Sequence, residues 1–409
     1  MSVPADNVTV VKRSRKTGPA GGITPELQQI LDAAASMTAK GQEPRRHHLV
    51  PKFYLERWAE RNLIRVTDLN NGRRSFSVPP SKALVETDYY RVPSESVQGG
   101  SPVLWETWLS AIEGDAAAVF ARIDEVGLEG LTEAQWGHLL NFLGVQISRS
   151  RSYRFQGRWM SGPAQYQLWE LDRPGAIEAT LRRAGEKPHP ERIKEIESYF
   201  VKVNADPWSV PIPAEHEMDM ALRAARSLAQ TLSTRQFVMY RTAMPLLTCD
   251  EPVVLFHEHM GNHQARSGGF FGAPIIVFPF GPRDVLAMFR QDLPVIRPND
   301  VELTWSETLE LNRAIAGNAH RHLVERPDGK LGANLFVPDS KDPAQIVNVA
   351  SRAGQDQELV WMPAQRRWTG HSDAPVRAVA SWWPAAVPPA PRPPSQGADW
   401  QRERDAYYA

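Results

Sequence analysis

The chain has 409 residues with 47 basic and 47 acidic side chains, so its net charge of zero provides no overall attraction to nucleic acid or acidic membranes. Hydrophobic residues make up 42% and charged residues 23%, which is ordinary globular composition and argues against a disordered or fibrous protein. The single cysteine, Cys249, excludes an intrachain disulfide framework.

The amino terminus lacks the apolar run of about 7 to 15 residues that a secretory signal requires. No stretch of about 18 consecutive apolar residues occurs in the chain. We therefore expect a cytoplasmic protein that has no membrane partner.

Three regions are expected along the chain. Residues 1–22 carry Lys12, Arg13, Arg15 and Lys16 and end in GPAGG, which predicts a flexible basic arm. Residues 23–370 are predicted to form a single globular α+β body. Residues 371–409 contain PAAVPPAPRPPSQ, and because prolines favour extended conformers, a flexible proline-rich tail is predicted.

The first predicted elements are two helices and a hairpin. Thr24 and Pro25 form a helix start, a cap followed by proline at the first helical position, and apolar residues continue to about Met37. Pro51 predicts the opening of a short helix in PKFYLERW. The runs LIRVTDL and RSFSV, separated by Asn70–Gly72, predict a β-hairpin because Asn-Gly tolerates positive φ angles.

Helical spacing predicts a helix over about 102–125, and further helices over about 191–203 and 215–232. Thr132 and Gln135 form a capping box for another helix, whose pattern can continue to Met160.

After Ser233 the runs QFVMYR, PLLTC, PVVLF, PIIVFPF and VLAMFR predict strands of one sheet. A helix over about 306–319 and a strand near HLVER follow. The expected fold class is α+β, with a helix-rich N-terminal half packed with a mainly antiparallel sheet from the C-terminal half.

Two acid-base candidates stand out. His48 lies just before the short helix that Pro51 opens, where an imidazole could act as a base or could satisfy nearby backbone groups. Asp250 lies at the expected end of a strand, where it could serve a site or accept backbone hydrogen bonds in an Asx-turn. Neighbouring Cys249 is expected to be a small core residue.

Candidate binding groups follow on the long helix. Gln146, Arg149 and Tyr153 are spaced by three and four and would share one face. Arg151, Arg154 and Arg158 add a local positive excess suited to phosphate or carboxylate, although a solvated face is the alternative.

His257, His259 and His263 in HEHMGNH could suggest a metal site. Their spacing matches no common zinc motif, so a surface histidine cluster is favoured and no metal ligand is assigned. No phosphate-binding loop, nucleophile elbow, HExxH helix or dinucleotide-binding turn occurs. No cofactor is identified.

Several segments together resemble a family of unknown function. HLVPKFYL, residues 48–55, is similar to the H-Y-V-P-x-x-Y-L motif of the largely bacterial domain-of-unknown-function family 4238, and TCDEPV, residues 248–253, is similar to its S-D-N-P-V motif. Weaker agreement covers Gln146 to Arg149 and the Leu311-Asn312 helix, so Asn312 joins the candidate binding residues. The resemblance covers about residues 46–330 and implies no activity.

We hypothesise an intracellular hydrolase, of the nuclease or phosphodiesterase kind, that acts on a phosphate-bearing substrate or nucleic acid. His48 would be the acid or base, Asp250 would orient it or bind a metal, and Arg149 would stabilise negative charge. The alternative is a noncatalytic ligand-binding or sensor protein in a defence or mobile-element system.

Overall fold

The computed structural model describes residues 25–41, 45–91, 101, 103–161, 174–183, 185–205, 214–256, 269–293, 302–339, 345–349, 358–362 and 367. The chain divides into two compact units. The first comprises Met1–Arg151, Ala214–Lys341 and Arg366–Val387, and the second Ser152–Pro213, Asp342–Gln365 and Pro388–Ala409. The basic arm over 1–22 and the tail over 371–409 lie outside the described residues, and the single body over 23–370 stays a prediction.

Most helices of the first unit begin close to where the sequence predicts them. The helices are α1 (Pro25–Ala39), α2 (Lys52–Leu55), α3 (Leu104–Val126), α4 (Glu133–Ser148), α9 (Ala214–Ser233), α10 (Gly269–Gly272), α11 (Trp305–Asn318) and α12 (Leu331–Asn334). The short helices α10 and α12 were not predicted. The capping box expected at α4 is present, because the Thr132 side chain accepts from the Gln135 backbone and the Gln135 side chain accepts from the Thr132 backbone.

The helix that begins after Thr132 does not continue to Met160. It ends at Ser148, and a separate helix, α5, spans Arg151–Ser161. The hydroxyl of Tyr89 donates to the carbonyl of Arg149 at 3.2 Å, which satisfies one of the acceptors that a helix end leaves open. This contact comes from a distant segment, so helix periodicity alone could not reveal it.

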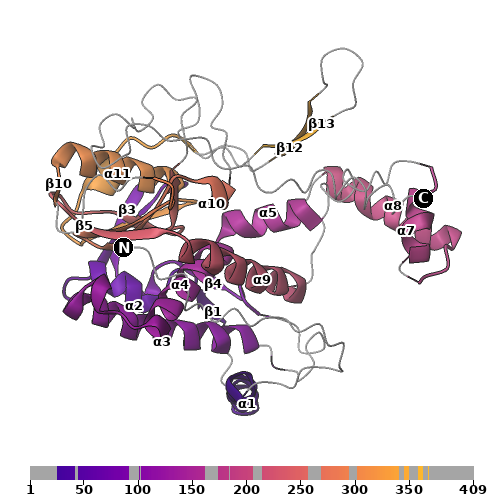
Figure 1. The fold of residues 1–409 in the computed structure, drawn as a ribbon, viewed down its shortest axis with the longest axis horizontal. Helices are drawn as coiled ribbons and strands as arrows, with labels where there is room; N and C mark the ends of the chain where they lie inside the picture. Colours follow the sequence, from indigo (N-terminus) through magenta and orange to yellow (C-terminus); the bar gives the residue numbers. More distant parts are fainter. Residues whose placement is uncertain are drawn as a thin grey trace. The chain divides into compact units, whose positions relative to one another are not determined.

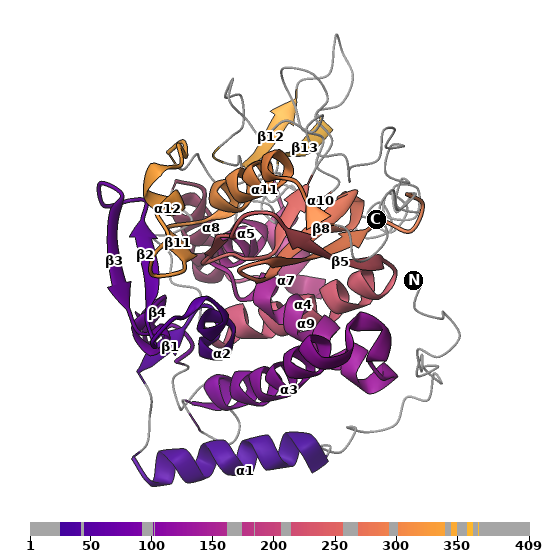
Figure 2. The same cartoon turned by 90° about the vertical axis from the view of Figure 1, so that its left-hand side faces the viewer.

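The larger sheet has the order β10-β5-β9-β8-β7 and pairs antiparallel except between β10 and β5. Its strands are β5 (Gln236–Thr242), β7 (Val254–Phe256), β8 (Ile275–Gly281), β9 (Asp284–Phe289) and β10 (Glu302–Leu303). Helices lie on both faces, with α11 on one side and α3, α4 and α9 on the other (Figure 1, Figure 2).

The core follows the period-2 alternation of these strands. Phe278 and Phe280 face the helical layer, where Phe280 stacks on Phe120 of α3 with ring centroids 4.4 Å apart. Val277, which precedes Phe278, points to the opposite face and belongs to a second core with Leu311 of α11. Because both faces of the sheet are covered, the sequences of its strands are nearly continuous runs of apolar residues. The chain is therefore α+β, with a helix-rich N-terminal half packed with a mainly antiparallel sheet from the C-terminal half.

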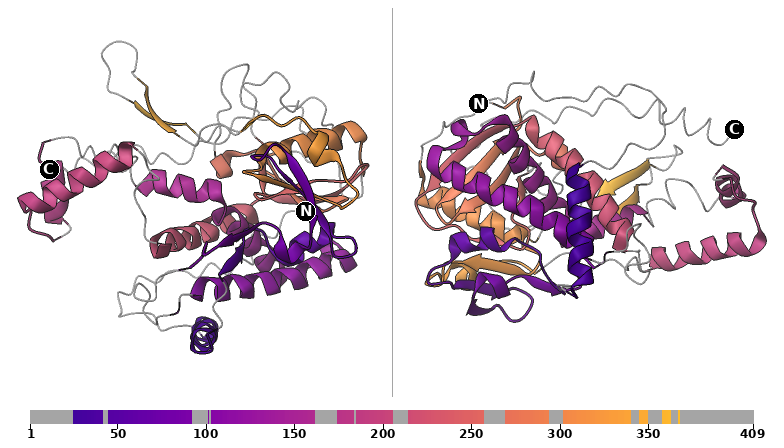
Figure 3. Two further views of the ribbon diagram at one scale, coloured as in Figure 1. Left: turned by 180° about the vertical axis from the view of Figure 1, so that it is seen from behind. Right: turned by 90° about the horizontal axis from the view of Figure 1, so that it is seen from below.

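The helical layer is closely packed. Gly144 of α4 leaves no room for a side chain, since a Cβ there would lie 2.4 Å from the carbonyl oxygen of Ala225 in α9. On the outer side, α1 lies across α3 (Figure 2, Figure 3), and the hydroxyl of Ser101 donates to the carbonyl of Ala34 at 3.1 Å. These contacts position the end of α4, from which candidate side chains project.

A smaller sheet has the order β3-β2-β11-β6. Its strands are β2 (Ile64–Asp68), β3 (Arg74–Val78), β6 (Thr248–Cys249) and β11 (His322–Glu325). The predicted hairpin is confirmed as β2–β3, but the positive φ angles of its turn lie at Gly72 and Arg73 and not at the Asn71-Gly72 pair. A separate pair joins β1 (Arg46–His48) to β4 (Val85–Thr87).

The expectation that all C-terminal strands form one sheet is wrong for β6. This strand, within the PLLTC run, pairs with β11 of the smaller sheet. The side-chain amide of Asn312 holds the chain leading into it, accepting from the Leu247 backbone at 2.7 Å and donating to the Pro245 carbonyl at 3.0 Å. Strand partners depend on such distant contacts rather than on local pattern.

In the second unit, α7 (Ala176–Arg183) and α8 (Pro190–Ala205) share a small core of Ile177, Leu181 and Phe200. Strands β12 (Gln345–Val349) and β13 (Glu358–Met362) form an antiparallel pair. The α8 and α9 bounds confirm the helices expected near 191–203 and 215–232.

Candidate functional site

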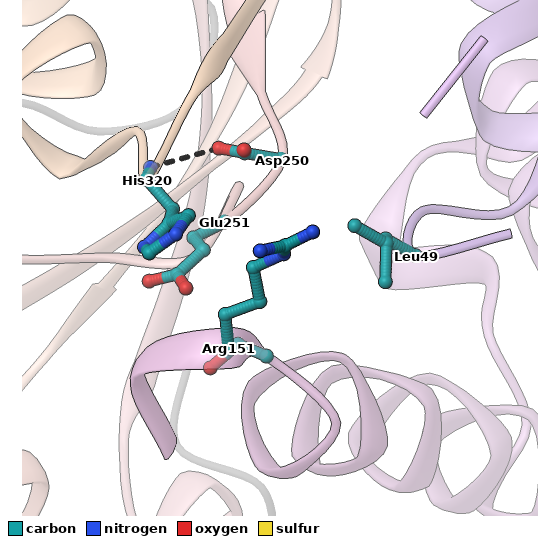
Figure 4. A pocket seen from close by; sticks show the side chains of 6 residues that line it. Leu49, Arg151, Asp250, Glu251 and His320 are labelled. Atoms are coloured by element: carbon teal, nitrogen blue, oxygen red, sulfur yellow. Dashed lines mark hydrogen bonds between the residues drawn. The ribbon is translucent and has the colours of Figure 1, made fainter. Parts of the chain in front are cut away.

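A crevice in the first unit gathers side chains from four separate segments (Figure 4). It is lined by Leu49, Ser150, Arg151, Asp250, Glu251 and His320. These residues follow β1, join α4 to α5, follow β6 and precede β11. The two motifs near residues 48 and 250, about 200 positions apart, therefore meet through Leu49 and Asp250.

Asp250 uses both carboxylate oxygens on the backbone that leads into β11. Oδ1 accepts from the His320 amide at 2.9 Å, and Oδ2 accepts from the amides of Arg321 and His322 at 2.8 and 3.0 Å. Asp250 does accept backbone hydrogen bonds, but not in the predicted Asx-turn, because the amides belong to a distant segment. Asp250 thus anchors the start of β11 beneath the crevice.

The segment that Asp250 anchors carries two histidines, His320 and His322, separated by one residue. Burial lowers the pKa of His320, with Asp250 opposing that shift and Arg151 reinforcing it. The pKa of His322 is lowered for the same first reason. Its Nδ1 lies 3.8 Å from Asp250 Oδ2, and its Nε2 lies 4.0 Å from Asp68 Oδ2. Both rings are therefore neutral near pH 7, the state in which an imidazole accepts a proton.

Arg321 points to a different partner from its two histidine neighbours. Its guanidinium binds the carboxylate of Asp68, at the end of β2, with the closest contact at 2.6 Å. This hydrogen bond lowers the pKa of Asp68. The pair joins β2 to the start of β11 and leaves His320 as the residue of this segment that faces the crevice.

Arg151 supplies the cationic group of the crevice. Its guanidinium lies between Leu49 on one side and Asp250, Glu251 and His320 on the other (Figure 4). It also forms an ion pair with Glu86 of β4. A guanidinium next to a neutral imidazole is suited to an anionic ligand, because it offers paired donors to oxyanions.

Gln146 and Arg149 form an internal network next to the crevice. Arg149 donates to Gln146 Oε1 and to Glu113 Oε1, the latter at 2.7 Å, and Gln146 Nε2 donates to the Leu49 carbonyl at 3.2 Å. The Arg149 side chain is only 3% exposed. Both residues therefore lie where they support Leu49, and Arg149 is already paired with a carboxylate.

His47 and His48 have different surroundings. His47, in β1, is 1% exposed, and its Nδ1 accepts from the Tyr90 amide at 2.9 Å. His48 also has a backbone hydrogen bond, to Pro80. The Nε2 of His48 is buried and has no hydrogen-bond partner in the described part of the chain. Burial lowers the pKa of His48, against the opposing charge of Glu113.

Glu106 joins the Arg149 network and should make stability depend on pH. Burial first, and then the charge of Glu113, raises its pKa from 4.5 to about 7, with Arg149 opposing. A raised carboxyl pKa means that the folded state holds its proton longer than the unfolded state. Stability is therefore greatest below about pH 4.5 and is lost as the pH rises through about 7, by at most about 3 kcal/mol.

Urea unfolding at pH 5 and pH 8 measures this loss. We expect Glu106→Gln to remove it, whereas Glu125→Gln, at an exposed position of the same helix, should retain the parent's difference between the two pH values. An equal pH dependence in the parent and in Glu106→Gln would contradict the assignment to Glu106.

The remaining predicted residues lie elsewhere. Asn312 is fully buried in the contact with Pro245 and Leu247 and does not line the crevice. Tyr153 falls on α5, past the break after α4, so it does not continue the Gln146 and Arg149 face as predicted. Cys249 is buried, as expected of a core residue, and burial raises the pKa of its thiol.

Sequence reasoning missed His320, Ser150 and Glu251 as lining residues, and it named Arg151 only as part of a basic run. One signal was available for His320. It alternates with His322 immediately before a predicted strand, a spacing that places two imidazoles on one side. Nothing local indicated that Asp250 would hold this segment.

Within the residues that the structure describes, no group of three His, Cys, Asp or Glu side chains is arranged to hold a metal ion. His257, His259 and His263 lie outside the described residues. The described helices also include none with the length and apolar character needed to cross a membrane.

The comparisons with known proteins place the chain in a family. None of the curated proteins and none of the solved structures matches it. The model of the family described as "Protein of unknown function (DUF4238)" matches residues 46–329, which include the His48 and Asp250 motifs and the His320 segment. The resemblance seen in the two sequence motifs thus extends over most of the chain, which belongs to the DUF4238 family.

Proposed function

We propose that this chain is a hydrolase of a phosphate-bearing substrate, with nucleic acid as one candidate class, and that the substrate binds at the crevice. The observation that carries the proposal is the pairing of a neutral imidazole, His320, with the guanidinium of Arg151 in one crevice. A phosphoryl group needs a cationic donor for its oxygens and a base for the attacking water, and these two side chains offer both.

In this proposal His320 takes a proton from water as the water oxygen bonds to phosphorus and the bond to the leaving oxygen breaks. The leaving oxygen is then protonated by solvent or by a second acid. His48 immediately precedes Leu49 of the crevice, but burial lowers its pKa, so it is not assigned as the source of that proton. Arg151 binds the phosphoryl oxygens, while Asp250 orients the His320 segment and Gln146 and Arg149 support Leu49. Asn312 is assigned no role in the proposed reaction.

The test is hydrolysis of bis-(p-nitrophenyl) phosphate, p-nitrophenyl phosphate and labelled DNA and RNA oligonucleotides by the purified full chain. We expect His320→Asn to lower kcat at least about 100-fold, since general acid-base catalysis contributes about that much. Arg151→Met should mainly raise KM. His138→Asn, an imidazole beside Asp115 on the helical surface, is the control and should retain activity. Hydrolysis that survives His320→Asn would rule out the proposed base.

A noncatalytic ligand-binding role is the second candidate. The observation in its favour is that Asp250 commits both oxygens to backbone amides and Arg149 is held by Glu113, so neither is available for chemistry. Under this role, inorganic phosphate or an oligonucleotide would bind to the parent without turnover, and Arg151→Met would abolish binding. Turnover that depends on His320 would exclude it.

A further inference from the structure

Arg367 is a buried arginine that binds carbonyl oxygens instead of a carboxylate. The residue is 4% exposed. Its Nε donates to the Ala319 carbonyl at 3.0 Å, its Nη2 to the His320 carbonyl at 2.6 Å and its Nη1 to the Pro338 carbonyl at 3.0 Å. Two of these three acceptors belong to the segment that carries the crevice imidazole.

These contacts complete an arrangement that Asp250 begins. The peptide group between Ala319 and His320 gives its N–H to Asp250 and its carbonyl to Arg367. The next peptide group, between His320 and Arg321, does the same. Each peptide dipole therefore lies with its N–H toward a carboxylate and its carbonyl toward a guanidinium, the favourable orientation for both charges.

The two peptide groups that flank a Cα define the φ and ψ angles of that residue, and so the direction of its side chain. Both peptide groups flanking His320 are held at both ends. Asp250 alone would hold only their N–H groups and would leave the carbonyls free to tilt. Arg367 also lies beyond residue 329, where the family match ends, so a later part of the chain binds to the segment of the crevice.

We propose that Arg367 is a positioning residue of the crevice, which acts with Asp250 to fix the backbone on both sides of His320 and thereby aims its imidazole at the space beside Arg151. The role as a positioning residue for catalysis rests on the proposed function, because it gives the His320 imidazole its task. The charge of Arg367 is also among the causes that lower the pKa of His320.

The experiment is an NMR titration of the histidine rings in the full chain, with the His320 signal assigned by its loss in His320→Asn. We expect Arg367→Met to raise the pKa of His320 by at least about half a pH unit, because a positive charge is removed and the ring becomes more solvated. In the phosphodiester assay kcat should fall about tenfold or more, with KM little changed because Arg151 remains.

Arg235→Met is the matched control. Arg235 is also buried, at 3% exposure, and binds the backbone carbonyls of Ala273, Met288, Phe270 and Phe271 instead of a carboxylate. Its loss should lower the thermal midpoint but leave the His320 titration unchanged. An equal His320 shift in Arg235→Met would overturn the proposal, since it would show a general loosening of the fold.

A parental His320 titration in folded Arg367→Met would also overturn it. If that variant does not fold, Arg367→Lys decides: its single ammonium group keeps the charge but cannot reproduce the planar fork that reaches three carbonyls, so a parental His320 titration together with a parental kcat there would overturn the proposal. The titration needs no substrate. If Arg367→Met shifts the His320 pKa but the parent hydrolyses no phosphate compound, the proposed function is excluded. If the parent hydrolyses such a compound but the His320 pKa does not shift in Arg367→Met, only the positioning role is excluded.

Discussion

Replacement of Asp250 by alanine is expected to lower the free energy of unfolding by about 3 to 5 kcal/mol. The carboxylate accepts three backbone amides, and a hydrogen bond to a charged group is worth about 1.5 to 3 kcal/mol. The side chain is 2% exposed, so water cannot easily replace the lost acceptor. Urea unfolding at pH 7 measures the change.

Asp250→Asn tests the same hydrogen bonds with a smaller change, since it keeps the shape of the side chain but replaces one acceptor oxygen with a donor. We expect Asp250→Asn to lower the free energy of unfolding by at least about half as much as Asp250→Ala does, because one oxygen accepts two of the three amides. Asp328→Ala, at a side chain that is 78% exposed, is the control and should change stability by less than about 0.5 kcal/mol. A neutral or stabilising Asp250→Ala would instead indicate a strained functional carboxylate.

Arg149→Met should also cost about 3 to 5 kcal/mol, because breaking a buried ion pair leaves the partner charge uncompensated. The guanidinium binds Glu113 Oε1 and Gln146 Oε1 at a site where its side chain is 3% exposed. Its loss removes the opposing charge beside Glu106, whose pKa should therefore rise further above about 7. The measurement is urea unfolding at pH 8, which lies above the pKa of about 7 of the Glu106 carboxyl in the parent.

The control for Arg149 is Arg122→Met on the exposed face of α3, where Arg122 pairs with Glu125 at 3.2 Å and 42% exposure. An exposed pair of this kind contributes about 0.2 to 1 kcal/mol. A double-mutant cycle with Glu113→Gln then isolates the Arg149 pair, and a coupling energy below about 0.5 kcal/mol would contradict the network described here.

The local pattern was most reliable where a segment's structure depends on its own residues. The Thr132 capping box, the β2–β3 hairpin and the apolar period of α3 were predictable because their hydrogen bonds and packing faces depend on residues close together in the chain. The same approach failed at Ser148, where α4 ends and the carbonyl of the following Arg149 accepts from the distant Tyr89. It failed again at β6, whose partner β11 lies more than 70 residues away.

The candidate site was likewise predictable from the sequence only in part. His48 and Asp250 were singled out by their positions at a helix start and at a strand end, and the motifs that contain them resemble those of the family and reach the crevice. The motifs could not predict the roles of these two side chains, because the role of a carboxylate depends on which groups hydrogen-bond to its oxygens. The Asp250 oxygens bind backbone amides, and the neutral imidazole beside it belongs to His320.

The α+β class, most of the helices, the hairpin and the family follow from local patterns in the chain, because periodicity, capping and motif are properties of short segments. Which polar side chains share a crevice depends instead on how distant segments pack. Burial and hydrogen bonding at Leu49, Arg151, Asp250 and His320 depend on segments that are brought together by the packed sheets and helices. Desolvation sets the protonation of an imidazole, and desolvation is a property of the folded chain.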